Sequence, residues 1–537
     1  MAVGFLSLPA ELICHILFLL TPKDICHCAT TCKTVCDAAR NSVDIQYKLE
    51  LYAQGFTETA TLDSVDVPTK MSSLKNLASL WQFDFYAKTV FEEVAAGTDE
   101  DSSERQYMKC GFWWMWAQRN LFVRDCNASM TLSRKWPTHN FSAEHQFLRS
   151  IIVDPLQDLV ITISSQISFV VIDAGQNHHV FLVEFWMALS QPPYSDSPCA
   201  SLECKHAFDV PDRYVVDIVD EPAICGDRVV ILYYIHQTQD LFIQVIDWKK
   251  GKTESHPLHQ PGGREATFRL VDRQTIVIIS GEGLLILYTL QELDGSPQRR
   301  VAYLPRLKHY SSQSYVIRTT PLFHSTTARL DLMPGYVPSL ESQIMVIEMF
   351  SEAWPVILVI DMVIFSQQVI QSQTSVEIPW SDWGPQYTYC FPHHQSHLIS
   401  VFGSKMAYAL PCARTPEPGE RVEGFSTNQD HFYVHIWDFN KRVIARAAND
   451  TSSPVPDIRK PGQVAQSSIF GDIISNHPYV ATVCRTPFKM HGFDKLFLEQ
   501  DRLTLTWTVV PTTSLATQYP GCLPRADGSW YGHRGLA

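Results

Sequence analysis

From about Tyr107 to its end, the chain alternates apolar and polar residues with a period of two. The apolar runs are short and rich in Val, Ile, Phe, Tyr and Trp; examples are DLVITIS (158–164), DRVVILYYI (227–235) and PVILVIDM (355–362). Turn residues separate the runs, which is typical of β-strands. No long helical patterns lie between them, so an antiparallel all-β domain is favoured over a parallel α/β sheet.

A short motif recurs in this region, in which a strand pattern ends in an apolar residue and an aspartate. It occurs at Ile172-Asp173, Ile246-Asp247, Ile360-Asp361 and Trp437-Asp438. The intervals suit one or two propeller blades of roughly 40 to 45 residues with irregular insertions. The pattern predicts a large, degenerate β-propeller, and the length of the region suggests seven or eight irregular blades. A pair of β-sandwiches would show the same alternation and is the alternative.

The N-terminal residues follow a helical period instead. A first helix is expected from Pro9, with Glu11 in its first turn. Its apolar residues fall on two adjacent stripes, Leu12-Ile16-Leu19 and Ile13-Leu17-Leu20. Three short helices cannot bury both stripes, so some apolar surface should be left for a partner.

Two further helices complete the expected three-helix module. Thr21-Pro22-Lys23-Asp24 supplies a cap hydroxyl, a proline at the first helical position and an acid three residues after the cap. The second helix would place Ile25, Cys28, Cys32 and Val35 on one face. The third would begin at Asn41 or Ser42 and end at Gly55, since glycine commonly ends helices.

A transitional stretch follows the module. Ser73 to about Val94 shows a looser helical pattern, and AGTDEDSSER (96–105) is acidic and almost free of apolar residues. We interpret this stretch as a helical and acidic linker. The predicted organisation is therefore a helical module at 1–56, a linker at 57–106 and a β domain at 107–537.

Residues 8–39, LPAELICHILFLLTPKDICHCATTCKTVCDAA, resemble an F-box. The matching features are Leu8-Pro9, Glu11-Leu12, Ile16-Leu17, Leu20, the helix start Pro22-Lys23-Asp24-Ile25, and Cys32-Lys33. The whole chain is similar to basidiomycete fungal F-box proteins with long, diverged, β-rich C-terminal regions. Two stretches carry this similarity, IIVDPLQDLVITI (151–163) and PWSDWGPQYTYCFPHH (379–394).

The resemblance implies a function for each part of the chain. The F-box would dock on the Skp-type adaptor, and through it on a cullin, in an SCF-type cullin–RING ubiquitin ligase. The β domain would capture an unknown target protein, and other subunits would transfer ubiquitin. Carried over by position, the adaptor-binding residues are Leu8, Pro9, Glu11, Leu12, Ile16, Leu17, Leu20, Ile25, Cys32 and Lys33. F-boxes often have a large aromatic residue where this chain has Val35.

Catalytic and metal sites are not indicated by the sequence. Cys28, Cys32 and Cys36 are four apart on a helix that has a core to form, which suits packing better than zinc binding. His393-His394-x-x-His397 lacks the glutamate of a zincin motif and is interpreted as an exposed polar turn. We therefore expect no catalytic residue, no metal and no cofactor. The alternative is a β-propeller enzyme or carbohydrate-binding protein with an F-box-like appendage.

The aromatic stretch PWSDWGPQYTYCFP (379–392) is the candidate for target recognition. Trp380, Trp383 and Tyr387 could form a recognition surface, because aromatic residues dominate interface hot spots. The alternative, which we favour, is that they pack a loop against the domain.

Composition narrows the partners and the compartment. The net charge is −13 and no basic cluster occurs, which argues against binding to nucleic acid or anionic membranes. No 18-residue apolar window suggests a membrane span, and no basic residue precedes the apolar run at Leu12–Leu20 as in a signal peptide. The 14 cysteines are then expected to be reduced thiols of a cytoplasmic or nuclear protein.

Overall fold

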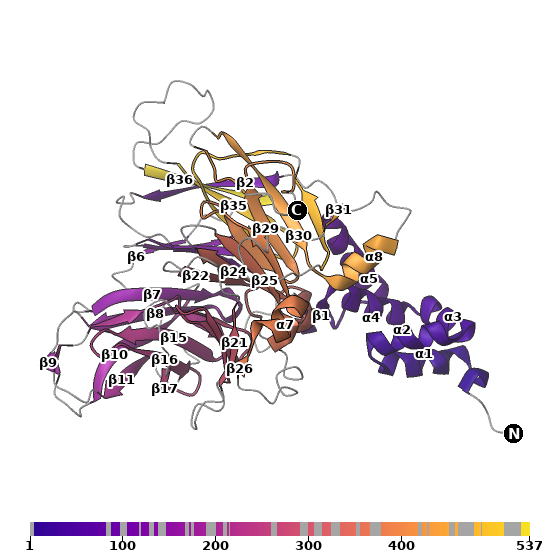
Figure 1. Cartoon of the computed structure of the whole chain (residues 1–537), viewed down its shortest axis with the longest axis horizontal. Helices are drawn as coiled ribbons and strands as arrows, with labels where there is room; N and C mark the ends of the chain where they lie inside the picture. Colours follow the sequence, from indigo (N-terminus) through magenta and orange to yellow (C-terminus); the bar gives the residue numbers. More distant parts are fainter. Residues whose placement is uncertain are drawn as a thin grey trace.

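The computed structural model places a group of helices beside a large β domain (Figure 1). It describes residues 5–81, 87–96, 105–117, 120–127, 134–137, 146–166, 171–172, 177–188, 200–207, 212–213, 215–258, 266–289, 299–304, 314–323, 333–350, 355–365, 377–416, 422–426, 429–449, 457–459, 477–484, 486–509 and 528–536. We call residues 5–81 the helical module and the remaining described residues the β domain.

The helical module is built mainly from short α-helices. Its elements are η1 (Phe5–Ser7), α1 (Ala10–Leu19), α2 (Pro22–Thr31), α3 (Lys33–Asn41), α4 (Val43–Gln54), β1 (Phe56–Glu58), η2 (Ala60–Leu62) and α5 (Val67–Leu80). The expected caps are present: the Thr21 hydroxyl accepts from the Asp24 N–H, and the Ser42 hydroxyl accepts from the Ile45 N–H. Gly55 ends α4 with a left-handed φ of 77°, a conformation that glycine adopts without a steric penalty.

The prediction of three helices before Gly55 was wrong in one respect. The expected second helix is two helices, α2 and α3, separated at Cys32, whose backbone is extended with φ −158° and ψ 158°. In the last turn of α2, the hydroxyls of Thr30 and Thr31 donate to the carbonyl oxygens of His27 and Cys28, each at 2.7 Å. Such side-chain bonds compete with helical backbone bonds and favour a helix end.

The helical pattern expected from Ser73 to about Val94 is also corrected. Helix α5 ends at Leu80, and the next described element is strand β2 (Ala87–Ala96). Strand β2 pairs antiparallel with β36 (Gly528–Leu536), at the other end of the chain. A local pattern cannot reveal so distant a partner, so the β domain includes residues 87–96. Residues 97–104, which hold most of the acidic segment, lie outside the described residues.

Six antiparallel sheets of the β domain are built from strands that are nearly consecutive in the chain. The first blade has β3 (Arg105–Lys109), β4 (Phe112–Ala117), β5 (Asn120–Asp125) and β6 (Arg134–Pro137). The second blade has β7 (Gln146–Asp154), β8 (Leu159–Gln166), β10 (Asn177–Met187) and β11 (Ser201–Ala207). The third blade has β13 (Val216–Ile218), β14 (Ala223–Cys225), β15 (Arg228–Ile235), β16 (Asp240–Asp247) and β17 (Lys252–Leu258). In the third blade, both β13 and β14 pair with β15.

The next three blades carry insertions. The fourth blade has β18 (Thr267–Leu270), β19 (Thr275–Ile279), β20 (Leu284–Thr289) and β21 (Arg299–Tyr303). The fifth blade has β22 (Ser314–Thr319), β24 (Ile344–Phe350), β25 (Val356–Asp361) and β27 (Thr388–Pro392). The sixth blade has β28 (Ile399–Phe402), β29 (Lys405–Leu410), β30 (His431–Asp438), β32 (Tyr479–Val483) and β31 (Asp457–Arg459). Strand β26 (Glu377–Ile378) adds to β21 in parallel, and β33 (Phe488–Lys489) pairs with β30.

Short elements occupy the connections between strands. They are η4 (Pro155–Gln157), β9 (Val171–Ile172) paired with β12 (Asp212–Arg213), β23 (Tyr336–Pro338), η8 (Leu340–Ser342), η9 (Met362–Phe365), α7 (Trp380–Tyr387) and α8 (Lys441–Asn449).

A further sheet joins the two ends of the β domain. Its order is β2-β36-β35-β34, with β34 at Phe493–Leu498 and β35 at Leu503–Val509. Contacts link the sheets one after another: β3 meets β34, β34 meets β28, and the contacts continue through β22, β18 and β14 to β7. An apolar core that includes Trp114 of β4 and Ile151 of β7 joins the first two blades and closes the ring. Seven sheets of four or more strands thus follow one another within the described residues, the last of them a closing sheet shared by both ends of the β domain.

Apolar cores between neighbouring sheets hold this arrangement together. At the closure, Trp113 and Met115 of the first blade are fully buried and pack with Phe497 of the closing sheet. Comparable cores lie between each other pair of neighbouring sheets. Side-by-side sheets around an axis, each packed on the next, are a β-propeller. The predicted fold class is confirmed, and the β-sandwich alternative is excluded.

The aspartate motif marks equivalent positions in the blades. Asp247, Asp361 and Asp438 each end the third strand of a blade. Each carboxylate accepts a hydrogen bond from a backbone N–H two or three residues later. The motif is therefore a strand followed by a side-chain-stabilised turn. Asp173 lies outside the described residues.

Candidate partner-binding surface

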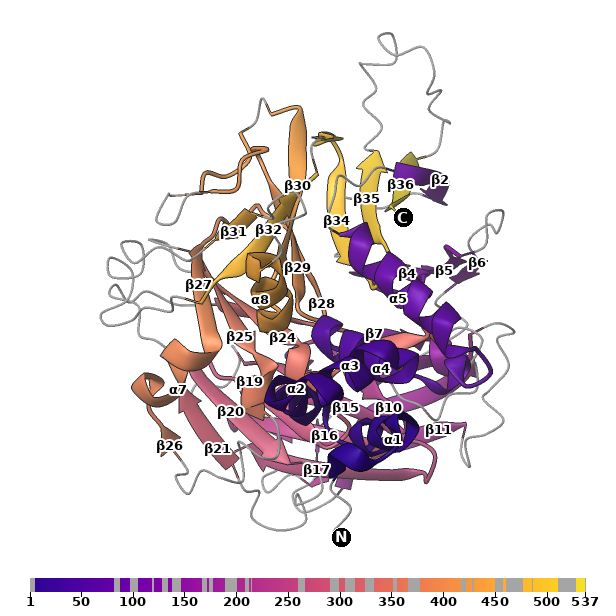
Figure 2. The same ribbon diagram turned by 90° about the vertical axis from the view of Figure 1, so that its right-hand side faces the viewer.

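Helix α1 presents its two apolar stripes to different surroundings. Ile13 and Leu17 are each 1% exposed, whereas Leu12, Ile16 and Leu19 are 49%, 37% and 72% exposed. The other helices of the module cover one side of α1 and leave the other side open (Figure 2). The stripe Leu12-Ile16-Leu19, which we call the α1 stripe, is the apolar surface that the sequence predicted to be left for a partner.

The buried stripe belongs to a small core that fixes α1 on its neighbours. Ile13 and Leu17 pack with a set of buried residues from the other helices, Ile25, Val35, Ala38, Ala39 and Ile45. The Lys48 ammonium group donates to the carbonyl oxygens of Phe18 and Leu20, at 2.7 and 2.8 Å. A cation at these orphan carbonyls favours the end of α1. The α1 stripe therefore sits on a well-anchored helix.

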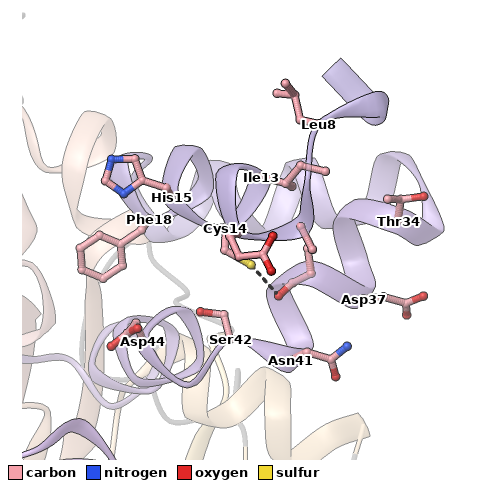
Figure 3. Close-up of a pocket in the computed structure, with 13 residues that line it drawn as sticks. Leu8, Ile13, Cys14, His15, Phe18, Thr34, Asp37, Asn41, Ser42 and Asp44 are labelled. Carbon is pink, nitrogen blue, oxygen red and sulfur yellow. Dashed lines mark hydrogen bonds between the residues drawn. The ribbon is translucent and has the colours of Figure 1, made fainter. Parts of the chain in front are cut away.

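A groove of about 920 Å³ runs beside the α1 stripe, between α1 and the pair α3–α4 (Figure 3). One wall is a face of α1, which includes Glu11 and Phe18, and the other is a face of α3, which includes Asp37. Ser42 and Asp44, at the start of α4, also line it. The two helices are tied at the floor, where the Cys14 thiol donates to the Ala38 carbonyl oxygen at 3.5 Å.

The helical module is joined to the β domain through α4 and β1. Strand β1 pairs antiparallel with β23 of the fifth blade. From α8 of the sixth blade, Arg442 lies over the Tyr52 ring at 3.4 Å from its centroid and donates to the Tyr52 carbonyl oxygen at 2.6 Å. Gly55 approaches Ser342 so closely that a Cβ would lie 2.4 Å from the serine Cβ. This close approach is a second reason for glycine at the end of α4.

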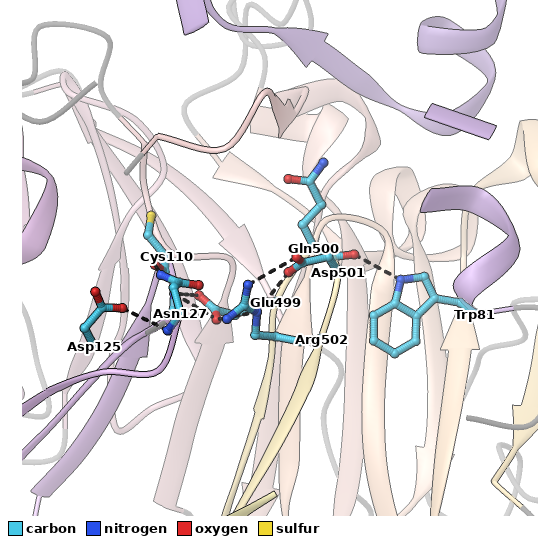
Figure 4. Close-up of polar contacts among 9 residues, drawn as sticks. Trp81, Cys110, Asp125, Asn127, Glu499, Gln500, Asp501 and Arg502 are labelled. Carbon is cyan, nitrogen blue, oxygen red and sulfur yellow. Dashed lines mark hydrogen bonds and ion pairs between the residues drawn. The ribbon is translucent and has the colours of Figure 1, made fainter. Parts of the chain in front are cut away.

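A buried polar cluster strengthens the same joint. The Tyr47 hydroxyl donates to Glu58 at 2.9 Å, Lys70 forms an ion pair with Glu58, and the Tyr336 hydroxyl of β23 donates to the Lys70 carbonyl oxygen at 2.8 Å. Burial, together with the hydrogen bonds, raises the pKa of Tyr47 well above its usual value, so the phenol stays neutral. At the far end of the module, the Trp81 indole donates to the Gln500 carbonyl oxygen at 3.0 Å (Figure 4).

A family model described as F-box-like matches residues 5–45, the segment from η1 to the first turn of α4. Residues 5–45 form an F-box-like domain.

Comparison with solved structures finds chains of low similarity. The C-terminal WD40 domain of Sif2 is 9% identical, with 84% of this chain and 99% of that chain covered and a TM-score of 0.33. U3-55K is 9% identical with the same coverages and a TM-score of 0.37. Hsv2p of Kluyveromyces lactis is 9% identical, with 63% and 92% covered and a TM-score of 0.29. Because these scores are low, the propeller assignment rests on the strand pairing and packing described above. A comparison with curated proteins finds no match to this chain.

The structure separates the predicted adaptor-binding residues of the F-box-like domain into two groups. The accessible ones are Pro9, Glu11, Leu12, Ile16 and Lys33, which are exposed, and Leu8, Leu20 and Cys32, which are partly buried. Leu17 and Ile25 are only 1% and 0% exposed and belong to the core of the module. Their assignment as contact residues is corrected: they support α1 from inside, because the surrounding helices cover them.

Sequence reasoning left several exposed apolar residues out of the site. Leu6, Phe18, Leu19 and Val43 are 55%, 45%, 72% and 48% exposed. Leu19 lay on the predicted stripe and could have been included, whereas Leu6 and Val43 lie outside the first helix, where its periodicity gives no signal. Among the described residues, the large apolar side chains that are exposed all belong to the F-box-like domain. This concentration singles it out as a partner-binding surface.

Of the three aromatic residues considered for target recognition, the structure buries one completely. Trp383 is fully buried in α7 and packs edge-on against Trp380, with ring centroids 4.8 Å apart. Trp380 and Tyr387 are partly buried against the core shared by the fourth and fifth blades. The packing interpretation is therefore correct for Trp383. A contact of Trp380 or Tyr387 with a target stays a prediction.

The histidine cluster is also corrected. His393 and His397 are 3% and 1% exposed, so they do not form an exposed polar turn. Each ring Nδ1 lies within hydrogen-bond distance of the Tyr408 hydroxyl, at 2.9 and 3.3 Å, and His393 Nε2 lies 3.3 Å from Glu348. In the described part of the chain, no group of three or more His, Cys, Asp or Glu side chains is arranged to hold a metal ion. The histidines form a polar cluster between the fifth and sixth blades.

The cysteines of the helical module are free thiols. Cys14, Cys28 and Cys32 are partly buried against its apolar core, as expected if they pack as small apolar residues. Within the described residues, no helix is both long and apolar enough to cross a membrane.

Proposed function

We propose that the chain is the substrate-receptor subunit of an SCF-type cullin–RING ubiquitin ligase, acting in the cytoplasm or nucleus. In this proposal the F-box-like domain binds a Skp-type adaptor, which links the chain to a cullin, and the β domain captures a target protein. The chain is a non-catalytic adaptor, and other subunits transfer ubiquitin to the captured target.

One observation carries the proposal: the α1 stripe is exposed on a helix that is otherwise firmly packed. In the free chain, Leu12, Ile16 and Leu19 expose apolar surface to water. Complete burial of such a side chain against a partner is favourable by roughly 1.5–3 kcal/mol. The F-box-like match over residues 5–45 indicates what kind of partner would cover them. The buried residues Leu17 and Ile25 then act by holding α1 in place.

The contacts between the helical module and the β domain suggest that the two faces of the propeller have different roles. The helical module contacts the insertion between β22 and β24, the α8 insertion between β30 and β32, and the turn between β34 and β35. In an antiparallel blade, connections from first to second and from third to fourth strand lie on one face of the propeller. We propose that the target binds the opposite face, which these contacts leave open.

Adaptor binding is tested with the purified full chain and a purified Skp-type adaptor, by calorimetry. Leu12→Asp with Ile16→Asp should abolish detectable binding, because two charges would be buried at the centre of the contact. Ala60→Asp with Pro68→Asp is the matched control, since both residues are exposed apolar residues of the helical module away from α1. The control should bind like the unmodified chain, and both variants should keep its melting temperature. Absence of a complex with the unmodified chain, or full binding by the α1 variant, overturns the proposal.

A further inference from the structure

Buried polar atoms without a hydrogen-bond partner gather in the interface between the fifth and sixth blades, which we call the seam. They include the Tyr389 hydroxyl, the Trp437 indole N–H and Nε2 of His397, whose side chains are 1%, 3% and 1% exposed. Folded proteins pair nearly all such atoms. Opening the seam would let these atoms bind water, which offsets part of the cost of exposing its apolar side chains. Local opening is therefore easier here than at an interface whose polar atoms are all paired.

His397 lies in the seam, in the connection between β27 and β28. Its Nδ1 is 3.3 Å from the Tyr408 hydroxyl of β29. The centroids of the His394 and His393 rings lie 5.5 and 6.2 Å from that of His397, and the Phe425 ring packs edge-on at 4.9 Å. Aromatic and imidazole rings therefore enclose His397 on several sides.

Two connections interlock around this ring. One is 393–398, from β27 to β28, and the other contributes 422–426, from β29 to β30. The His394 ring packs so closely on Gly424 that a Cβ there would lie 2.2 Å from the ring Cε1 atom. One connection joins neighbouring blades and the other joins a second strand to a third, so both lie on the face opposite the helical module. Displacing the His397 ring would therefore loosen both connections on that face.

The closed seam has no place for a second proton on His397. The Tyr408 hydroxyl has one hydrogen and is shared, because His393 Nδ1 also lies 2.9 Å from it. Nε2 of His397 has no hydrogen-bond partner, so an N–H at this atom would be buried without an acceptor. Because a buried, unpaired charge is costly, the closed seam favours the neutral ring.

The charged side chains of the seam contact His393 instead. Glu348 of β24 lies 3.3 Å from His393 Nε2 and accepts from Arg318 of β22 at 2.7 Å. The Glu423 side chain is exposed. Burial, and then the charges of the two neighbouring histidines, lower the pKa of His397 to about 3 from 6.5, although the Glu423 backbone acts to raise it. The surroundings of the ring thus oppose its protonation.

We propose that the connection 393–398 is an acid-sensitive latch: uptake of a proton from water drives the His397 ring out of the seam and frees the connection, while the blades stay folded. In the open state the imidazolium is hydrated. The Tyr408 hydroxyl and the Phe425 ring become accessible to water on the face opposite the helical module. The latch requires neither an adaptor nor a target, so it holds or fails independently of the proposed function.

Proton linkage determines how strongly acid should act on the latch. Between pH 6.5 and 3 the open state binds the proton and the closed state does not, so the equilibrium constant for opening rises as the pH falls. From about pH 7.5 to about pH 5 the increase should be about 30-fold, since the hydrated ring has an ordinary pKa. Above about pH 7.5 the equilibrium constant should no longer depend on pH.

Amide hydrogen exchange of the full chain, followed by mass spectrometry, measures this opening. The reporters are the His397 N–H, which donates to the His394 carbonyl oxygen at 2.9 Å, and the Phe425 N–H, which donates to the Ser396 hydroxyl at 3.3 Å. After correction for exchange in unstructured peptides, both should exchange about 30-fold faster at about pH 5 than at about pH 7.5. At both pH values they should exchange faster than the amides of β15, which need global unfolding.

His397→Gln removes the group that takes up the proton. In this variant the corrected exchange of the latch should differ by no more than about threefold between the two pH values. His431→Gln replaces an exposed histidine of the same blade and is the matched control, which should keep the increase of about 30-fold. If His397→Gln does not fold, exchange of the imidazole C2 hydrogen in the unmodified chain gives the pKa of His397 directly.

Each outcome supports or overturns the latch. An increase lost in His397→Gln and kept in His431→Gln supports it, as does a His397 pKa below about 5 in the unmodified chain. The latch is overturned if the increase persists in His397→Gln, if the unmodified chain shows no increase, or if its His397 pKa is the ordinary one. Equal exchange of the latch and of β15 would mean that the seam opens only with global unfolding, which also overturns it.

Discussion

Arg446 of α8 and Glu50 of α4 form a two-point ion pair, with guanidinium-to-carboxylate distances of 2.9 and 3.0 Å. The residues are 396 positions apart in the chain, and their pairing joins the sixth blade to the helical module. Glu50 is largely buried, with 13% of its side chain exposed, whereas Arg446 is 55% exposed. The joint thus pairs a largely buried carboxylate with a cation that is more than half exposed to water.

Arg446→Ala is expected to weaken the joint only modestly. Because the guanidinium is more than half exposed, the pair should contribute no more than about 1 kcal/mol. Arg442→Ala should lower the free energy of unfolding by more, about 1–2 kcal/mol. The reason is that Arg442 both covers the Tyr52 ring and donates to the Tyr52 carbonyl oxygen. Urea unfolding monitored by tryptophan fluorescence, with limited proteolysis of the 54–66 segment, measures both effects. A larger loss for Arg446→Ala than for Arg442→Ala would contradict this ranking.

The same ion pair predicts an acid response of the joint. Burial alone would raise the pKa of Glu50, but hydrogen bonds from Arg446 and Gln54 lower it below its usual value. The folded state therefore binds this proton more weakly than the unfolded state does. The contribution to stability is present above the unfolded pKa and is lost as the pH falls below it. Proteolysis of the 54–66 segment should accelerate at acidic pH, and Glu50→Gln should remove that dependence.

Two buried histidines should make the protein less stable as the pH falls. Their effect begins at a higher pH than that of Glu50. Burial lowers the pKa of His397 to about 3 and that of His435 to about 4, from 6.5. Between these values and 6.5 the unfolded state binds more protons, so the free energy of unfolding falls as the pH falls. Between about pH 7.5 and about pH 5, each histidine should lower the free energy of unfolding by about 2 kcal/mol. Urea unfolding across this range measures the slope.

The histidine prediction is checked by removing one group at a time. His435 donates through Nε2 to the Cys412 carbonyl oxygen at 2.9 Å, and His435→Gln keeps a donor that can reach the same oxygen. This variant should show a shallower slope than the unmodified chain, and His15→Gln, at an exposed position, should not. An unchanged slope for His435→Gln would show that His435 binds its proton equally well in the folded and unfolded states, and would contradict the prediction.

Local patterns in the sequence were sufficient for the helical module and for the class of the β domain. The caps at Thr21 and Ser42 and the end at Gly55 depend on residues a few positions apart, so short-range chemistry decides them. The two stripes of α1 were also visible, and the structure decided which one is buried. The division at Cys32 was missed, because periodicity alone continues through it.

Features made by distant residues could not be predicted in this way. Strand β2 reads locally as a continuation of a helix, but its partner β36 lies at the other end of the chain. The groove beside the α1 stripe exists only once α1 has packed on α3 and α4, because all three helices contribute to its lining. His393 and His397 read as a polar turn, and only their packing beside Tyr408 and Glu348 buries them. In each case tertiary contact overrides the local pattern.

A buried ion pair between the first two blades predicts a large single-site effect. Lys109 Nζ lies 3.1 Å from Asp154 Oδ1, with 10% and 4% of the side chains exposed. Asp154 also accepts from the Gln157 side chain at 2.8 Å. Lys109→Met would leave the carboxylate buried without its cation, which should lower the free energy of unfolding by about 3–5 kcal/mol. Adding Asp154→Asn should restore part of this loss, and a purely additive double variant would contradict the pairing.

Glu499 predicts a pH dependence of opposite sign to that of the histidines. This residue, in the turn between β34 and β35, accepts from the Gly111 N–H with both oxygens at 3.1 Å, while Arg502 Nε is 3.9 Å away (Figure 4). Burial raises the pKa of the carboxyl to about 7 from 4.5, although the Arg502 charge and the Gly111 N–H each lower it. The folded state therefore binds a proton that the unfolded state has released. The contribution of Glu499 to the free energy of unfolding is therefore fully present below the pKa of the unfolded state, and it is lost as the pH rises through 7.

Glu499→Gln isolates this effect, because the amide oxygen can still accept from Gly111 but cannot ionise. Relative to the unmodified chain, the variant should gain about 2–3 kcal/mol of unfolding free energy between about pH 5 and about pH 8. Glu282→Gln, at an exposed position of the fourth blade, is the control and should show no such gain. Because Glu499 links the closing sheet to the turn of the first blade, the gain should appear where the ring closes, as slower amide exchange at Gly111. A difference between variant and unmodified chain that is constant across this pH range would mean that the Glu499 carboxyl is ionised throughout in the folded protein.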